Sequence, residues 1–194
     1  MENNPYAPPK AAVADVEPAA TDALAFFPVS RTKLVVMSLL TFTLYQLVWF
    51  YKNWALERAR GTPAMPIMRA IFAVFFCYSL FNRIRRRRND LPSARLPAGV
   101  LAAGWIIVTL LSGVYDRIGM RVEEPALVFL VSLLLGYSSV LFLIPVQNAV
   151  DTINRDEAPG HDPNSRFTVW NWLWMILGGV MTLAGLVGTL LPEP

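Results

Sequence analysis

The chain has 194 residues, of which 55% are hydrophobic and 16% charged, with a net charge of +3 and a mean hydropathy of +0.42. Soluble domains carry roughly 25% charged residues, so this composition excludes an ordinary water-soluble globular protein, which needs a polar shell. The apolar residues come in long blocks, as in helices that cross a membrane. We therefore predict an all-α protein, a polytopic transmembrane helical bundle of about five spans.

The N-terminal segment, residues 1–28, is rich in proline, alanine and acidic side chains and shows no apolar periodicity. This composition predicts a disordered tail. The segment has no basic stretch followed directly by an apolar one, so we do not expect a secretory signal peptide. A transmembrane helical domain over 29–194 is predicted to follow.

Five apolar runs predict the spans, at 34–51, 67–82, 98–115, 126–146 and 169–191. The second run is shorter than the usual minimum for a span and carries Arg69 near its start. An interfacial or re-entrant helix is the alternative there, and we favour a crossing in which Arg69 extends toward the interface.

Polar side chains follow the fourth run at short spacings. We expect the helix to emerge there into water with a polar face, made of Gln147, Asn148, Asp151 and Asn154.

The first run has a polar face. Thr41, Tyr45 and Trp49 recur at every fourth position, and Gln46 adds a second polar group in mid-run. Polar residues in hydrocarbon normally turn toward other helices. These four residues are therefore predicted to form a packing or functional site, and a pore lined by Thr41, Tyr45 and Gln46 is the alternative.

A polybasic cluster follows the second run, at Arg83, Arg85, Arg86, Arg87 and Arg88. Each such arginine can contribute roughly 1 kcal/mol of attraction to anionic lipid. A topology anchor that prevents translocation is the interpretation that we favour over lipid recognition. Both roles place the cluster in the cytoplasm.

Small residues line one side of the last run, where Gly178, Thr182, Gly185 and Thr189 follow one another at helical spacings. Such a stripe lets helices approach closely. We predict helix packing within the monomer rather than a dimer interface.

The distribution of lysine and arginine keeps the polybasic cluster inside and the C-terminus outside, whether or not the run 67–82 crosses. A long proline-rich tail is easier to keep inside. We therefore expect a multi-pass protein of the bacterial inner membrane, with a cytoplasmic N-terminus and a periplasmic C-terminus.

The segment from Thr41 to Lys52, Thr-Phe-Thr-Leu-Tyr-Gln-Leu-Val-Trp-Phe-Tyr-Lys, together with Phe81 and Arg83 at the end of the next run, resembles a family of small bacterial membrane proteins of unknown function. The first span of that family reads Thr-x-Gly-x-Tyr-x-x-x-Trp, and Thr43 stands here where the pattern has glycine. The resemblance covers about 29–88. It implies a membrane location and no known activity.

Chemistry-bearing residues are sparse. With one histidine, His161, and one cysteine, Cys77, the chain offers neither a metal cluster nor a nucleophile beside a base. We expect no catalytic, cofactor or metal site and no enzyme. The absence of a basic face interleaved with aromatic residues argues against nucleic acid as a partner.

The expected partners are membrane lipids, anionic lipid included, and a protein partner or a second copy of the chain. The best prediction is a structural or partner-binding membrane component. A small-solute transporter or channel is the alternative.

Overall fold

The computed structural model describes residues 24–89, 96–119 and 124–190. All regular structure in these ranges is helical, so the all-α prediction is confirmed for them. In chain order the helices are α1 (Arg31–Leu40), α2 (Leu44–Ala59), α3 (Pro66–Ile71), α4 (Ala73–Asn89), α5 (Ala98–Gly119), α6 (Pro125–Glu157) and α7 (Val169–Leu190). Most of the tail predicted to be disordered lies outside the described residues.

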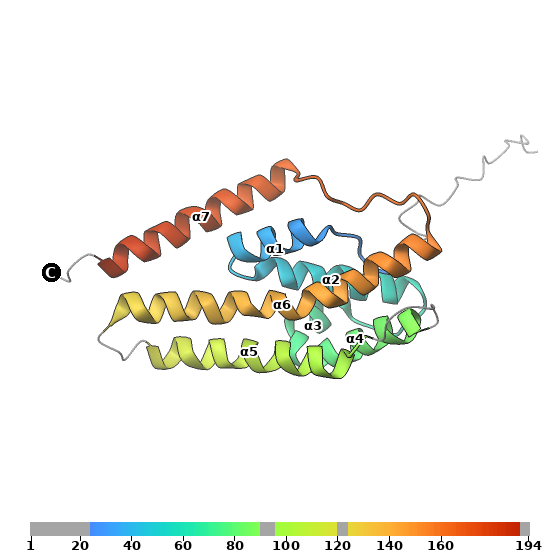
Figure 1. The fold of residues 1–194 in the computed structure, drawn as a ribbon, viewed down its shortest axis with the longest axis horizontal. Helices are drawn as coiled ribbons and strands as arrows, with labels where there is room; N and C mark the ends of the chain where they lie inside the picture. The colour runs from blue at the N-terminus through green and yellow to red at the C-terminus, as the bar shows by residue number, and fades with distance from the viewer. Residues whose placement is uncertain (1–23, 90–95, 120–123, 191–194) are drawn as a thin grey trace, which may run out of the picture.

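Three helices, α5, α6 and α7, are long and apolar enough to cross a membrane. They correspond to the last three predicted spans, and α5 and α6 pack along each other while α7 lies against α1 and α6 (Figure 1). Only 17%, 17% and 11% of their most apolar windows is buried. Apolar surface of this extent is unfavourable in water, so it is suited to contact with lipid.

Helix α6 is longer than the predicted fourth span. Its 33 residues continue through Pro145 to Glu157, which corresponds to about 50 Å at 1.5 Å per residue. A hydrocarbon core is only about 30 Å thick. Helix α6 is therefore longer than a single crossing requires.

The predicted first span, 34–51, is wrong as a single helix. Helix α1 ends at Leu40 and α2 begins at Leu44, and between them Phe42 and Thr43 have φ values of 49° and 65°. The N–H of Thr43 donates to the carbonyl of Ser38, a 6→1 bond of the kind that closes a helix end with a left-handed residue. The chain therefore turns back, and α1 and α2 form a hairpin (Figure 1).

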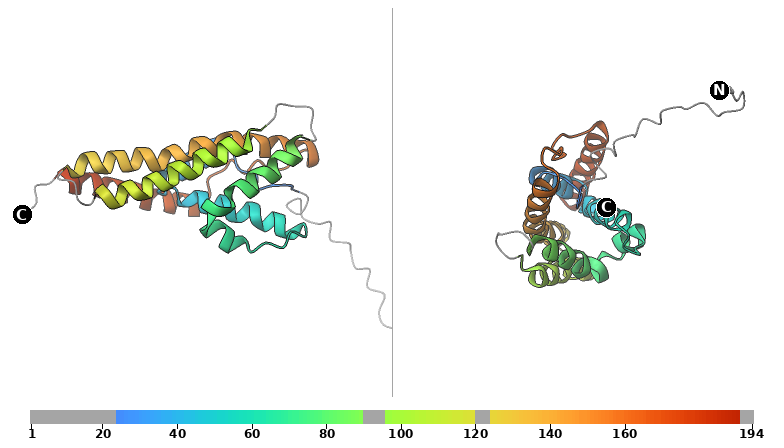
Figure 2. Two further views of the ribbon diagram at one scale, coloured as in Figure 1. Left: turned by 90° about the horizontal axis from the view of Figure 1, so that it is seen from below. Right: turned by 90° about the vertical axis from the view of Figure 1, so that its right-hand side faces the viewer.

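The predicted second span, 67–82, is also divided. Helix α3 stops at Ile71, α4 starts at Ala73, and the two meet at an elbow at Phe72 (Figure 2). Arg69 does not extend freely toward the interface, because its guanidinium lies over the rings of Trp54 and Phe76, at 4.3 and 5.2 Å from their centroids.

The boundary predicted for the tail, at residue 28, lies too far along the chain. Leu24, Ala25 and Phe26 are buried. The backbone N–H of Phe26 donates to Asn154 Oδ1 over 3.1 Å, and Asn154 Nδ2 donates back to the carbonyl of Phe26 over 2.8 Å. A side-chain amide thus satisfies both backbone groups of Phe26, which fixes this segment against α6.

Aromatic rings from α2, α4 and α5 fill the core. Phe50 meets Trp49 and Trp105 edge to face, with centroids 5.2 and 5.0 Å apart, and stacks on Phe81 at 6.3 Å. Pairs of this kind contribute about 0.5–1.5 kcal/mol each beyond the area that they bury. The cluster fixes α2 and α4 against α5.

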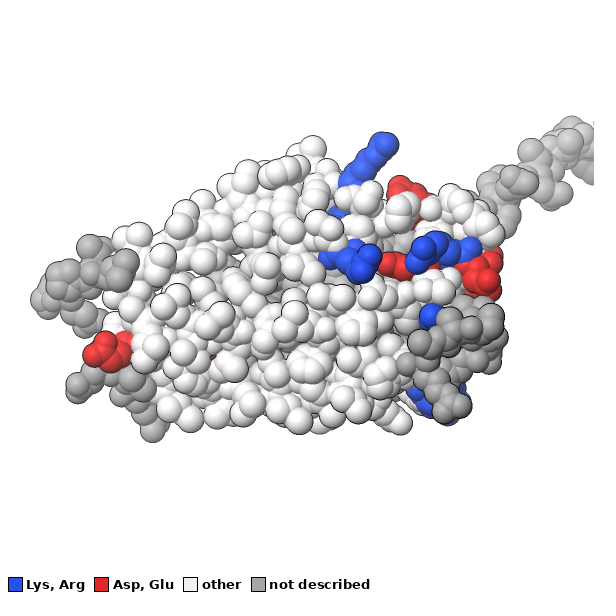
Figure 3. Space-filling view, in the orientation of Figure 1, with Lys and Arg blue, Asp and Glu red and all other residues white. Residues whose placement is uncertain are grey.

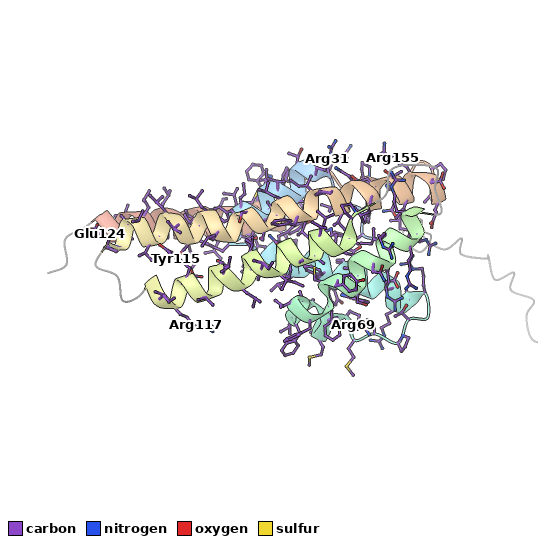
Figure 4. The ribbon with its side chains drawn as sticks, turned by 60° about the horizontal axis from the view of Figure 1, so that its bottom comes forward. Arg31, Arg69, Tyr115, Arg117, Glu124 and Arg155 are labelled. Atoms are coloured by element: carbon purple, nitrogen blue, oxygen red, sulfur yellow. The ribbon has the colours of Figure 1, made fainter. Side chains whose placement is uncertain are left out.

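Charged residues gather at one end of the molecule (Figure 3). We call this the cationic end, defined by the last turns of α2, α4 and α6 and the residues Arg58, Arg60, Arg83, Arg85, Arg86, Arg87, Arg88 and Arg155. Figure 4 places Arg31, Arg69 and Arg155 on this side and Tyr115, Arg117 and Glu124 at the opposite end. Between the two groups, α5, α6 and α7 have no charged residue over 98–115, 125–150 and 169–190, as a membrane protein requires.

Candidate functional site

Buried polar side chains connect α2 to α5 and α6. Gln46 Nε2 donates to Ser139 Oγ over 2.8 Å, and its Oε1 accepts from Trp105 Nε1, also over 2.8 Å. Gln46 and Ser139 are both 3% exposed. Both ends of this amide are therefore bonded within the chain.

A second contact lies two helical turns farther along α6. Trp49 Nε1 donates to Gln147 Oε1 over 2.7 Å, and Gln147 Nε2 donates to Asp151 Oδ1 over 2.7 Å. Gln147 and Asn154 are fully buried, whereas Asn148 is exposed. The sequence predicted that the polar residues from Gln147 to Asn154 face water on one side of the helix. This prediction is wrong for Gln147 and Asn154, because α2 and the segment before α1 cover that side of α6.

The third contact involves Asn53, which is fully buried. Its Nδ2 donates to the carbonyl of Trp49 over 2.9 Å, and its Oδ1 accepts from the backbone N–H of Phe27 over 3.1 Å. We use the name polar ladder for the buried side chains that make these bonds between α2, the segment before α1, α5 and α6: Gln46, Trp49, Asn53, Trp105, Ser139, Gln147 and Asn154.

Two of the four residues predicted on the first polar face, Gln46 and Trp49, belong to the polar ladder. Thr41 instead caps the hairpin turn, where its Oγ1 donates to the carbonyl of Met37 over 2.6 Å and accepts from the N–H of Tyr45 over 3.0 Å. Tyr45 is buried beside it.

The sequence analysis missed Asn53 and placed Gln147 and Asn154 of α6 in water, although both are buried. One signal was available in the chain. Gln46 and Asn53 are seven residues apart, and so are Gln147 and Asn154. Seven residues are two helical turns, so each pair lies on one side of its helix, which is the arrangement expected of two helices that face each other through amides.

At the cationic end, Glu57 holds two arginines. Its carboxylate, whose side chain is 9% exposed, accepts from Arg83 Nη1 over 3.0 Å and is also paired with Arg60. The hydroxyl of Thr62 donates to Glu57 Oε2 over 3.2 Å. Burial lowers the pKa of Arg60, and the neighbouring Glu57 opposes this effect. Glu57 therefore joins the end of α2, the loop that follows it and α4.

The predicted polybasic cluster is partly neutralised. Arg87 binds Glu157 through two bonds of 2.6 Å, and Arg85 donates to Asn82 over 2.6 and 3.0 Å. Arg86 is exposed. A cavity of about 710 Å³ opens here, and its lining includes three arginines and two glutamates: Arg83, Arg86, Arg87, Glu57 and Glu157.

The small-residue stripe of α7 contacts other parts of the same chain. A Cβ added at Gly178 would lie 1.7 Å from the carbonyl oxygen of Leu40, and one at Gly185 would lie 2.7 Å from the ring of Phe129. Thr182 and Thr189 donate to carbonyls of their own helix, those of Gly178 and Leu186. Gly178 thus allows α7 to touch the backbone at the hairpin turn.

Within the described ranges no group of three or more His, Cys, Asp or Glu side chains is placed to hold a metal ion. Cys77 is buried in α4, and a ring nitrogen of His161 lies 3.0 Å from the carbonyl of Ala158.

Comparison with protein-family models, with curated proteins and with solved structures finds no match. The likeness of the segment Thr41–Lys52 to a family of bacterial membrane proteins therefore stays a prediction.

Proposed function

We propose that this chain is a structural or partner-binding component of the bacterial inner membrane, in which α5, α6 and α7 cross the bilayer. The hairpin α1–α2 and the elbow α3–α4 enter from the cationic end and return to it. This topology replaces the expected five crossings with three. It keeps the N-terminus in the cytoplasm and the C-terminus in the periplasm.

The contact that most supports three crossings is the one through Glu57. In a five-span chain, Arg60 and Arg83 would lie on opposite faces of the bilayer, yet both are paired with this one carboxylate. The chain has 17 lysines and arginines, and three crossings place all of them except Arg117 and Arg121 on the side of the cationic end. An excess of this size marks the cytoplasmic side.

The length of α1 agrees with a re-entrant hairpin. Its 10 residues correspond to about 15 Å, or half of a hydrocarbon core of about 30 Å. Lys52, eight residues after the start of α2, is exposed, which fits a position where the returning arm reaches the headgroups.

The polar ladder carries the proposal of a structural role. The side-chain amides of Gln46, Asn53 and Gln147 each use both their oxygen and their nitrogen in bonds within the chain. Polar groups that are saturated in this way specify how helices pack. They offer little to a solute that would have to exchange its water for protein groups.

The cationic end is the surface that we propose for partners. Its cavity of about 710 Å³ is lined by more arginines than glutamates, and Arg86 is exposed there. Anionic lipid headgroups or an acidic segment of a protein partner are the ligands that such a surface attracts.

One feature favours the alternative of transport. A cavity of about 260 Å³ lies between the hairpin turn, α5 and α6, and its lining includes Thr43, Ser112, Asp116 and Ser132. Ionisable residues near the membrane interior often mark ion paths. The flux measurement below includes Asp116 for this reason.

The test combines flux with crosslinking. Purified protein in sealed liposomes should give no more flux of small ions and metabolites than empty liposomes. A photo-crosslinking residue at Arg86 should give reproducible protein or lipid adducts in intact cells, and the same residue at the outward-facing Val180 of α7 should give lipid adducts alone. Flux that Asp116→Asn removes, with the unfolding free energy unchanged, would overturn the proposal in favour of transport.

A further inference from the structure

The hairpin turn lies halfway along the long helices. Leu40 contacts Gly178, which is the tenth of the 22 residues of α7. Gln46, at the start of α2, contacts Ser139, the fifteenth of the 33 residues of α6. The α1–α2 hairpin therefore contacts α6 and α7 at about the middle of the spans.

The two halves of the molecule consequently differ in width. Figures 1 and 2 show α1, α2, α3 and α4 beside the half of α5 and α6 that is nearer the cationic end, while α5, α6 and α7 are the described helices of the other half. With a helix diameter of about 10–12 Å, two to four additional helix cross-sections occupy roughly 150–450 Å² more in that half. This is a large difference for a protein of three crossing helices.

The outer side of the additional helices is apolar. On α3, the elbow and α4, five large hydrophobic side chains are at least half exposed: Ile67 61%, Met68 52%, Ile71 60%, Phe72 50% and Phe75 78%. They continue the exposed apolar surface of α5, where Val100 is 70% exposed. Lipid chains are the surroundings that this continuous surface fits, and the charges of the cationic end set the level of the headgroups above it.

We infer that the chain is a wedge in the membrane, because helices α1–α4 expand one leaflet only, and that it favours bilayers whose leaflet on the cationic side is convex. This inference rests on the three-crossing topology proposed above. A convex leaflet has more area per lipid at headgroup level, so the wider half fits there with less compression of its neighbours. The partner of the lipid-facing surface is thus a curved bilayer rather than one lipid species.

Orientation supplies an internal control for the test. In a Cys77→Ala background, Asp156→Cys places a thiol at the exposed cationic end, and Glu124→Cys places one at the opposite end. Both variants are reconstituted into giant vesicles in mixed orientation and treated from outside with a dye that cannot cross the bilayer. The Asp156→Cys label then reports molecules with the cationic end outward, and the Glu124→Cys label reports the reverse.

Narrow tubes pulled from these vesicles have a convex outer leaflet. We expect the Asp156→Cys label to be at least about twofold denser on the tube than on the vesicle, equivalent to about 0.4 kcal/mol, and the Glu124→Cys label to be depleted. Equal label densities on the tube and the vesicle, or the same preference for both labels, would overturn the wedge. This includes the case in which a second protein or a second copy of the chain covers the outer side of helices α1–α4.

A chain that carries both Pro63→Cys and Asp156→Cys separates this result from a failure of the topology. If three helices cross, both thiols lie on the side of the cationic end, so each molecule takes up two dyes from outside or none. One dye per molecule would place the loop after α2 on the opposite side and contradict the three-crossing topology rather than the wedge.

Discussion

The indole N–H of Trp49 in α2 donates a 2.7 Å hydrogen bond to the side-chain oxygen of Gln147 in α6, and both residues are fully buried. This bond joins the returning arm of the hairpin to α6, which is long and apolar enough to cross a membrane. It explains why α2 follows α6 toward the cationic end. If the two helices separated, the buried indole and the buried amide would lose each other as hydrogen-bond partners, and no water would replace them.

Gln147→Leu should therefore lower the free energy of unfolding by about 1–3 kcal/mol, because the buried indole of Trp49 loses its acceptor and Asp151 loses a donor. Unfolding in mixed micelles, followed by tryptophan fluorescence, measures the loss. Asn148→Ala is the matched control on the exposed side of α6 and should change stability by less than about 0.5 kcal/mol. Equal effects of the two substitutions would contradict the importance of this bond.

Thr43→Gly should stabilise the fold by about 0.5–1 kcal/mol. Thr43 is β-branched and has a φ of 65°, a conformation that glycine adopts without strain, and part of the gain is offset by the greater freedom of glycine in the unfolded chain. The same unfolding assay checks it. Gly61→Ala, at a φ of 88° with open space around it, should lose about 1 kcal/mol. A loss of stability in Thr43→Gly would contradict the hairpin turn.

Gly178→Ala should displace α7, because the new methyl group would lie 1.7 Å from the carbonyl oxygen of Leu40. Backbone cannot move aside as a flexible side chain can, so we expect a loss of about 1–3 kcal/mol. Gly179→Ala is the neighbouring control, with no atom within 4 Å of its added Cβ, and should be neutral or slightly stabilising. If both variants unfold alike, α7 does not pack on the hairpin turn.

Glu57→Gln should weaken the contact between the end of α2 and α4. The substitution leaves Arg60 and Arg83 without their shared carboxylate, and because both arginines are partly exposed we expect a loss of about 1–2 kcal/mol rather than that of a fully buried pair. Glu157→Gln is the comparison, since its ion pair with Arg87 is more exposed. A larger effect at Glu157 than at Glu57 would contradict the central role of Glu57.

Hydropathy alone predicted α5, α7 and the apolar part of α6, because each is a single uninterrupted apolar segment. It did not reveal the hairpin, since Leu40 and Leu44 are apolar on both sides of the turn and no glycine or proline marks it. The resemblance to the pattern Thr-x-Gly-x-Tyr held a clue, because its glycine position corresponds to Thr43, where φ is positive.

Long-range pairing accounts for the remaining differences. Nothing in the local sequence around Glu57 predicts that Arg83, 26 residues later, contacts it. Likewise, the polar residues after Pro145 have a composition typical of a water-facing helix end, and only the position of α2 shows that Gln147 is buried. The amide spacing of seven residues in α2 and α6 was the one local indication of this contact.

The side of the membrane on which the loop after α2 lies tests the three-crossing topology most directly. With Cys77→Ala as background, Pro63→Cys and Glu124→Cys are each treated in intact spheroplasts with a maleimide that cannot cross the membrane. Three crossings predict that Glu124→Cys is labelled at once and that Pro63→Cys is labelled only after the cells are opened. Labelling of Pro63→Cys in intact spheroplasts would place this loop in the periplasm and contradict the re-entrant hairpin.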